Sequence, residues 1–286
     1  MIDQETKQLL EKFQKNEITE HFVYKTLSNL DKGKNKETLK KISDEELEHY
    51  HIWRKYTGKD ITPNKSKIFK YLLLSKLLGL TFTVKLMEKG ESHAQEVYSK
   101  ITKIPEAKSV LSDEKKHEKS LVNLIDEEKL RYVGSIVLGL NDALVELTGT
   151  IAGLTFALQN AKLVGMAAAI TGVAATLSMS ASEYLSKKSE GEKKPFKASF
   201  YTGIAYMLTV LILVLPFLII SSHYIALCLT LAFAVLIILA FTYFISVCKD
   251  LPFGKRFGEM ALISLGVAAV SFLIGLALRA FLGVEA

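Results

Sequence analysis

Apolar residues are concentrated in the second half of the chain. Five long apolar runs predict helices over about 132–159, 163–186, 198–220, 223–248 and 258–282. Each run can cross a hydrocarbon layer of about 30 Å, which takes roughly 20 helical residues. Residues 1–130 are far more polar and show no convincing strand alternation. The pattern therefore predicts an all-α chain, with a soluble domain at 1–130 and a five-span membrane domain at 131–286.

Four helices are predicted in the soluble half, over about 3–30, 35–56 and 66–99 and from 106 onward. The breaks between them are marked by Gly33, Gly58, Pro63 and Pro105. The fourth helix is expected to run into the first membrane helix. Within the third, the run YLLLSKLLGLTFTV is interrupted by Lys76 and is too short to span a membrane. We expect this run in the core of a helix bundle or on a face lying against the membrane.

Charge follows the same division. Residues 131–286 hold 11 of the 36 Lys and Arg and 8 of the 30 Asp and Glu, which leaves 25 and 22 for residues 1–130. The net charge of +6 divides into +3 and +3, which is too mixed to indicate a nucleic-acid partner. The two cysteines form no disulfide framework or metal motif. The N-terminus has no apolar signal region, so no cleaved secretion signal is expected.

Acidic residues interrupt the first two apolar runs. Asp142 and Glu146 are four residues apart and share one helix face, and Met179 and Glu183 have the same spacing in the second run. A carboxylate in a bilayer is costly, so it usually faces the bundle interior and marks an ion path. Carboxylates with a thioether suit a divalent transition metal such as Fe²⁺. Alternatively, Met179 fills the core and Glu183 reaches water from the end of its helix.

Glu259, near the start of the fifth run, has two interpretations. It attracts cations to the mouth of a pore, or it balances Lys255 and Arg256. Basic residues also predict the topology, because cytoplasmic loops are enriched in them. They gather between runs two and three (Lys187, Lys188, Lys193, Lys194 and Lys197) and between runs four and five (Lys249, Lys255 and Arg256). The N-terminal domain is therefore expected in the cytoplasm and the C-terminus outside, in a multi-pass protein of a prokaryotic plasma membrane.

The soluble half contains a second set of potential ligands. Glu46 with His49, and Glu114 with His117, form two ExxH pairs, each on one helix face. Lone glutamates stand on the other two helices, Glu17 on the first and Glu91 on the third; Glu20 and Glu88 are possible extra ligands one turn away. A Glu from each of two helices plus an ExxH from each of the other two is the ligand set of ferritin-like di-iron bundles. The alternative is a solvated charged helix face.

The phrases NEITEHFVYKTLS, DEELEHYHIW, EKGESHAQEVY and DEKKHEKSL resemble the rubrerythrin branch of the ferritin-like superfamily over about 1–125. The resemblance implies a four-helix bundle with a di-iron centre that reacts with O₂ or peroxide. Its ligands would be the six residues Glu17, Glu46, His49, Glu91, Glu114 and His117, with Tyr24 as a supporting partner. Ala94 replaces a further glutamate common in rubrerythrins, and no CxxC pair is present. Both departures count against rubrerythrin-type peroxidase chemistry.

The phrases GLNDALVELTGTIAGL and LSMSASEYLS resemble the vacuolar iron transporter family over nearly all of 131–286. That family implies a five-span homodimer that carries Fe²⁺, sometimes Mn²⁺, out of the cytoplasm in exchange for protons. By this resemblance Asp142, Glu146, Met179 and Glu183 line the translocation path. The long Glu-rich loop of plant members is absent, and only the polar segment 187–197 joins runs two and three. The combined arrangement resembles the membrane-bound ferritins of prokaryotes.

The sequence thus favours a proton-coupled exporter of Fe²⁺ or Mn²⁺, with a bundle that captures or senses iron. The alternative is an enzyme: a membrane-anchored di-iron ferroxidase or a peroxide-reducing protein. A third hypothesis is that metal in the bundle regulates the pore.

Overall fold

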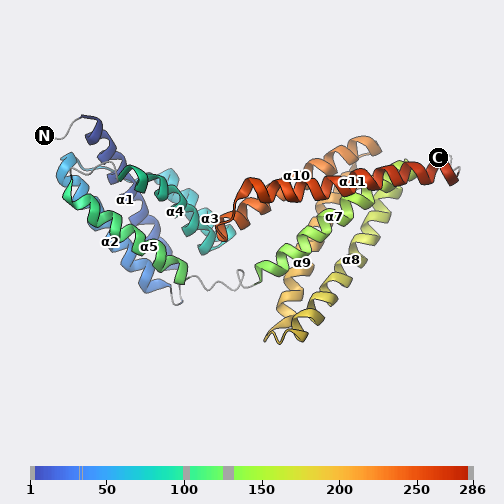
Figure 1. Ribbon diagram of the computed structural model, residues 1–286, viewed down its shortest axis with the longest axis horizontal. Coiled ribbons are helices and arrows are strands. Elements are labelled where there is room, and N and C mark those ends of the chain that lie inside the picture. Colours follow the sequence, from blue (N-terminus) through green and yellow to red (C-terminus); the bar gives the residue numbers. More distant parts are fainter. Residues whose placement is uncertain (1–3, 32, 34, 99–103, 125–131, 283–286) are drawn as a thin grey trace. The chain divides into compact units, whose positions relative to one another are not determined.

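The computed structural model describes residues 4–31, 33, 35–98, 104–124 and 132–282, and within these the side chains of 91–98, 118–120, 122–124 and 282 are outside the description. The described residues form ten helices and no strand, which confirms the all-α prediction (Figure 1). The chain divides into two compact units, an N-terminal unit of residues 1–127 and a C-terminal unit of residues 128–286.

The N-terminal unit contains five described helices: α1 (Gln4–Leu30), α2 (Lys36–Thr57), α3 (Lys65–Leu78), α4 (Leu80–Tyr98) and α5 (Pro105–Leu124). Helix α1 packs against α2 and α3, and α5 packs against α2 and α4. Two buried apolar clusters hold these helices together. One surrounds Trp53 and Phe13, and the other surrounds Tyr24, Ile42 and Met87.

The third predicted helix, 66–99, is interrupted. Gly79 separates α3 from α4 with φ 97° and ψ 165°. A side chain at that φ is strained, whereas glycine adopts it readily. The described part of this unit therefore has five helices where four were predicted. The predicted continuation of the last helix into the membrane falls on residues 125–131, which lie outside the described residues.

The segment between α2 and α3 is held against the first two helices. Helix α2 ends at Gly58, whose φ of 68° is the left-handed conformation usual at a helix C-terminus. Further on, the Ile61 amide donates to the Tyr50 hydroxyl, and the Asn64 amide donates to Thr19 Oγ1. These contacts join the segment to both helices, which carry three of the six predicted metal ligands.

The C-terminal unit contains α7 (Val133–Leu158), α8 (Ala161–Ser189), α9 (Pro195–Ile219), α10 (His223–Cys248) and α11 (Phe253–Leu282). All five are long and apolar enough to cross a membrane, so the chain is a multi-pass integral membrane protein. The five predicted spans are confirmed. Helices α9 and α11 begin earlier than their apolar runs, because Pro195 favours the first turn of α9 and because α11 includes the polar turn at Lys255 and Arg256.

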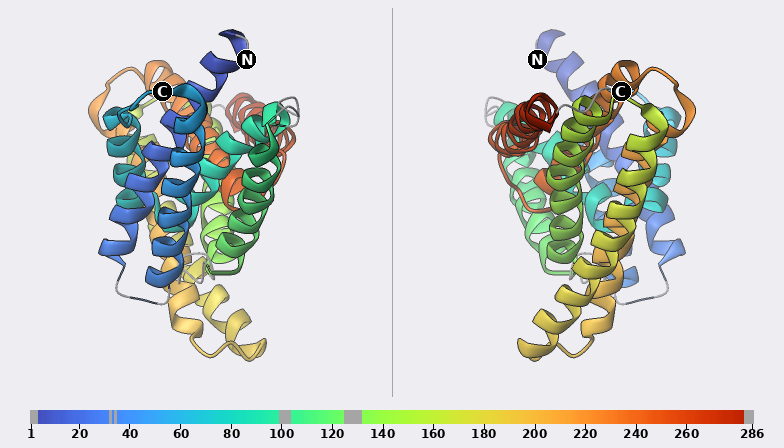
Figure 2. Two further views of the ribbon diagram at one scale, coloured as in Figure 1. Left: turned by 90° about the vertical axis from the view of Figure 1, so that its left-hand side faces the viewer. Right: turned by 90° about the vertical axis from the view of Figure 1, so that its right-hand side faces the viewer.

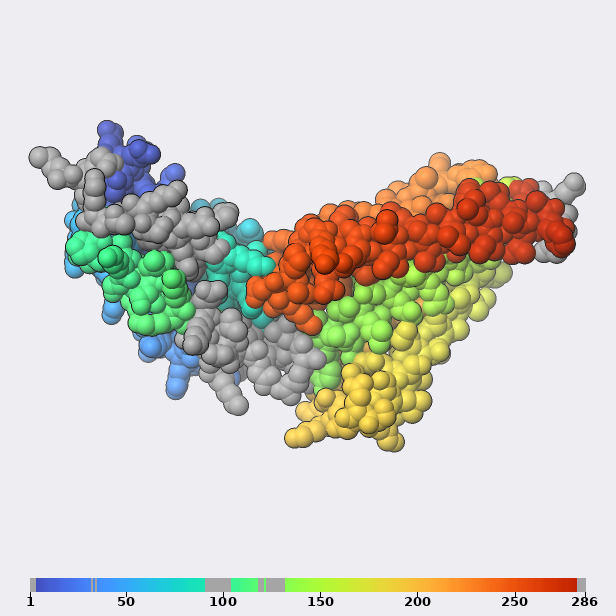
Figure 3. Space-filling view, in the orientation of Figure 1, coloured from blue at the N-terminus to red at the C-terminus, as the bar shows by residue number. Residues whose placement is uncertain are grey.

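Helix α7 is central to this unit. It packs against α8, α9, α10 and α11, and α8 packs along α9 (Figures 1 and 2). Its glycines allow close approach to α11, which forms an exposed ridge in Figure 3. A Cβ on Gly149 would lie 3.0 Å from Val267 Cγ1, and one on Gly153 would lie 3.0 Å from the Ser271 carbonyl oxygen. The GxxxG sequence therefore serves packing within the chain.

Candidate metal sites

Four potential ligands from three helices converge in the N-terminal unit. Glu17 comes from α1, Glu46 and His49 from α2, and Glu114 from α5; all four are buried, and one ligand atom from each lies within 4.8 Å of the others. His49 Nδ1 lies 3.2 Å from Glu114 Oε1, 3.5 Å from Glu46 Oε2 and 3.9 Å from Glu17 Oε2. These residues are called the Glu–His cluster below.

His117 adjoins this cluster from α5. Its Nδ1 lies 3.3 Å from Glu46 Oε1, and its ring stacks on His49 with 5.8 Å between centroids. The helical i, i+3 spacing places each histidine one turn beyond its glutamate, and the packing of α2 against α5 brings the two pairs together. The structure thus gathers five of the six predicted ligands. The sixth, Glu91, belongs to α4, and its side chain lies outside the described residues.

The cluster contains polar atoms that lack hydrogen bonds. Among the described residues, three such buried atoms belong to it, Glu46 Oε2, His49 Nδ1 and Glu114 Oε2, and a fourth is Nδ1 of the adjoining His117. Each buried polar group left unsatisfied costs about 1–3 kcal/mol. A cation bound between these neighbouring side chains would satisfy such carboxylate and imidazole atoms by coordination. The donor set fits a divalent transition metal, so the cluster can hold a metal ion.

The same burial favours protons when no metal is bound. Burial raises the pKa of Glu17, and the charge of Glu114 raises it further. Burial also raises the pKa of Glu46 well above its ordinary value, with added repulsion from Glu114 and Glu17. For His49 burial lowers the pKa, but the contacts with Glu114 and Glu17 outweigh it and the net change is upward. A cation entering the cluster would therefore displace protons.

Two supporting residues were missed at the sequence level. Glu45 Oε2 lies 2.7 Å from His117 Nε2, so it accepts the ring N–H and leaves Nδ1 facing Glu46. Such outer carboxylates orient metal-binding histidines. Trp53 donates its indole N–H to Glu17 Oε1 at 3.0 Å. Trp53 could have been found from its i+4 spacing to His49, which places both on one face of α2. Glu45 lies on a different face of α2 from Glu46, so only the packing of α2 against α5 reveals its contact with His117.

The remaining predicted residues of this unit lie near the cluster or in the core. Tyr24 is buried among the apolar residues of the second core cluster. Glu20 is half-buried, and its charge contributes to the raised pKa of Glu46. Glu88 is half-buried on α4. Their supporting and extra-ligand roles stay predictions.

In the C-terminal unit, α7 carries two neighbouring carboxylates. The Tyr206 hydroxyl of α9 donates to Glu146 Oε2 at 2.6 Å, and Tyr206 itself is fully buried. Asp142 lines a cavity of about 490 Å³ together with Asn141 and Met260. Glu146 lines a second cavity, of about 310 Å³, between α7 and α11. Helix α7 thus carries Glu146, which accepts a hydrogen bond from Tyr206, and Asp142, which lines a cavity with the thioether of Met260.

The other two predicted path residues lie on α8. Glu183 is buried and accepts a hydrogen bond of 2.5 Å from Ser135 Oγ of α7. Ser135 precedes Asp142 by seven residues, so the two positions are about 10 Å apart along α7. Met179 is half-buried against the core of this unit. The acids therefore lie at two levels along α7: Asp142 and Glu146 on the helix itself, and Glu183 of α8 beside Ser135. Their role as an ion path stays a prediction. Glu259 is exposed near the start of α11.

Comparison with known families adds one finding. The VIT family model matches residues 133–194. The matched segment comprises α7, α8 and the turn that follows, and it contains all four predicted path residues. Similarity to the VIT family indicates a membrane transporter of iron or another divalent metal. No curated protein and no solved structure matches the chain.

Proposed function

We propose that this protein exports Fe²⁺, or Mn²⁺, from the cytoplasm in exchange for protons. One observation carries the proposal: Asp142 and Glu146 lie one turn apart on α7, the helix that packs against all four other membrane helices, within the VIT-like segment. Asp142 is half-buried and Glu146 is exposed in this unit. Carboxylates in membrane-spanning helices are costly unless cations or protons neutralise them. The same groups that release a metal ion can take up a proton, which couples the two flows.

The chain's own residues would position these carboxylates. The Tyr206 hydroxyl donates to Glu146, and Asp142 lines a cavity together with Asn141 and Met260. Ser135 holds Glu183 at the second level of α7. A metal ion would be passed between the two levels, with Met179 and Met260 as soft ligands that favour Fe²⁺ over Mg²⁺ or Ca²⁺.

The N-terminal unit would be a ferritin-like di-iron bundle in the cytoplasm. The Glu–His cluster, His117 and Glu91 would hold the iron, while Glu45 and Trp53 orient two of those ligands. A bound pair of irons would supply redox chemistry between Fe²⁺ and Fe³⁺. In the transporter this unit would capture or sense iron before export, and the protein would work as a homodimer.

A second candidate function is enzymatic. The Glu–His cluster is buried, whereas a site that only passes ions onward would be expected to open to water. This favours a membrane-anchored ferroxidase, which oxidises Fe²⁺ with O₂ or peroxide as the electron acceptor. Stopped-flow mixing of the full-length protein with excess Fe²⁺ and O₂ separates the two candidates. Repeated turnover that is lost in Glu46→Gln supports the enzyme, and binding without turnover excludes it.

Transport is tested in proteoliposomes under a set pH gradient. The proposal predicts uptake or release of Fe²⁺ and Mn²⁺ down their gradients, with opposite movement of protons and little flux of Zn²⁺. Glu192→Gln, at an exposed position between α8 and α9, should retain the wild-type rate. Fe²⁺ flux that leaves the internal pH unchanged would disprove the coupling, and absence of flux for every divalent ion would disprove the transporter.

A further inference from the structure

Helix α3 is apolar on two opposite faces. Ile68, Tyr71 and Leu72 are half-buried and pack against the second core cluster. Phe69, Leu73 and Leu77 occupy the opposite side of the helix and are 69%, 43% and 63% exposed. No residue of α3 is fully buried. One apolar stripe thus packs on the bundle core, and the other belongs to no core cluster of the described residues.

The exposed stripe is bordered by positive charge. At 100° per residue, Lys65 and Lys76 flank one side of the stripe, and Lys67 and Lys70 flank the other. All four lysines are exposed, and residues 65–78 contain no acidic residue. An apolar stripe between two rows of lysines is the pattern of a helix that lies in the surface of an anionic membrane.

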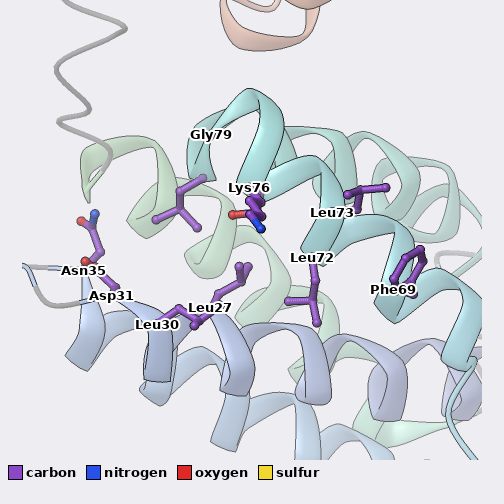
Figure 4. Close-up of a pocket in the computed structure, with 11 residues that line it drawn as sticks. Leu27, Leu30, Asp31, Asn35, Phe69, Leu72, Leu73, Lys76 and Gly79 are labelled. Atoms are coloured by element: carbon purple, nitrogen blue, oxygen red, sulfur yellow. The ribbon is translucent and has the colours of Figure 1, made fainter.

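The stripe borders a hollow in the surface. A cavity of about 840 Å³ lies between the end of α1 and α3, lined mainly by apolar side chains. Leu27 and Leu30 reach into it from α1, opposite Leu72 of α3 (Figure 4). Leu30 is 70% exposed. The apolar surface therefore extends from α3 onto the end of α1, which makes it broader than one helix stripe.

This surface belongs to the end of the bundle from which the chain continues to the membrane helices. The core cluster under α3 includes Leu121, in the last turn of α5. Eight residues, 125–132, then connect α5 to α7.

We propose that α3 is an interfacial helix that rests on an anionic lipid surface, with Phe69, Leu73 and Leu77 entering the headgroup region and the four lysines contacting lipid phosphates. A second copy of the chain fits this surface less well, because a two-fold pairing of α3 would oppose four lysines to four lysines. The proposal is independent of transport and of metal binding: it assigns the bundle a docking face, not a chemical role.

Bromolipid quenching tests this docking in the full-length chain. The sequence has one tryptophan, Trp53, and it is fully buried. Phe69→Trp adds a reporter on the exposed stripe. His51→Trp adds a matched reporter at an exposed position in the C-terminal half of α2, outside the stripe. Both variants are reconstituted in bilayers of phosphatidylcholine with brominated phosphatidylglycerol.

The proposal predicts that bromolipid quenches the emission of Phe69→Trp and not that of His51→Trp. Replacing Lys67, Lys70 and Lys76 by Gln should weaken the contact with the anionic lipid. The quenching of Phe69→Trp should then fall to the level seen in bilayers that contain little phosphatidylglycerol. Two results would overturn it. Equal access of aqueous iodide to both reporters would mean that the face is open to water. Protection from iodide without bromolipid quenching would mean that protein, such as a second copy, covers it.

Discussion

At the scale of single residues, the most informative atoms are those left without hydrogen bonds. Glu46, His49 and Glu114 of the Glu–His cluster and the adjoining His117 each have one such buried atom. The ExxH spacing predicted this convergence because i and i+3 share a helix face. Glu45 and Tyr206 could not be predicted in the same way. Each acts on a residue of another helix, and that pairing depends on tertiary packing.

Glu45→Gln tests the support of His117. A neutral amide accepts the His117 N–H less strongly and does not fix which ring nitrogen faces the metal. Loss of such an outer carboxylate typically weakens metal binding by roughly 10- to 100-fold. Titration with Co²⁺, followed by its visible absorption, measures the change. Glu48→Gln, at an exposed position on the same helix, is the control and should bind as the wild type does.

The pKa shifts predict a pH dependence of metal binding. Glu17 and Glu46 have pKa values raised above 4.5, so the metal-free bundle binds more protons than the unfolded chain. The stability of the metal-free bundle should therefore fall as the pH rises through the raised pKa values. Metal affinity should rise over the same range, because the ion displaces these protons. Calorimetric titration in buffers of different ionisation enthalpy counts the protons, and zero release would contradict the assignment.

Tyr206→Phe tests the hold on Glu146. The change keeps the buried ring and removes the hydroxyl that donates to Glu146 Oε2. Hydrogen bonds to charged groups contribute about 1.5–3 kcal/mol. We expect Fe²⁺ transport to slow by roughly tenfold, with the helix content unchanged. Tyr201→Phe, earlier on α9, serves as the matched control in the same flux assay. Equal rates for the two variants would remove Tyr206 from the account.

At the scale of helices, apolar runs predicted the five membrane spans but not the full lengths of their helices. The polar first turns of α11 extend that helix beyond its apolar run. The break between α3 and α4 was missed because Gly79 has leucines on both sides, and its left-handed φ is a property of the folded backbone. The packing of α11 against Gly149 and Gly153 likewise depends on tertiary structure and could not be predicted from the spacing of the two glycines.

A pair of glycines on α11 tests that seam. A Cβ on Gly275 would collide with the backbone oxygen of Gly153, whereas one on Gly266 meets no atom within 4 Å among the described residues. Overpacking of this kind typically costs about 1–3 kcal/mol. Gly275→Ala should therefore lower the apparent Tm in detergent, and Gly266→Ala should leave it unchanged or raise it slightly. A larger loss from Gly266→Ala would contradict the packing of α7 against α11.

At the scale of the whole molecule, the division of charge and apolarity predicted a multi-pass membrane protein with a polar N-terminal part. The VIT match over residues 133–194 supports metal transport for the membrane helices, and the Glu–His cluster of the N-terminal unit is a candidate metal site. Neither the spacing nor the composition of the sequence says how the two units work together.

The most direct test of the account is the initial rate of Fe²⁺ flux in proteoliposomes containing Asp142→Ala. Asp142 is the one acidic residue among the described residues that line the cavity on α7. We expect flux to be abolished in Asp142→Ala while helix content and metal binding by the Glu–His cluster stay at wild-type levels. Fe²⁺ flux at the wild-type rate in this variant would contradict the proposal that the ion passes along α7.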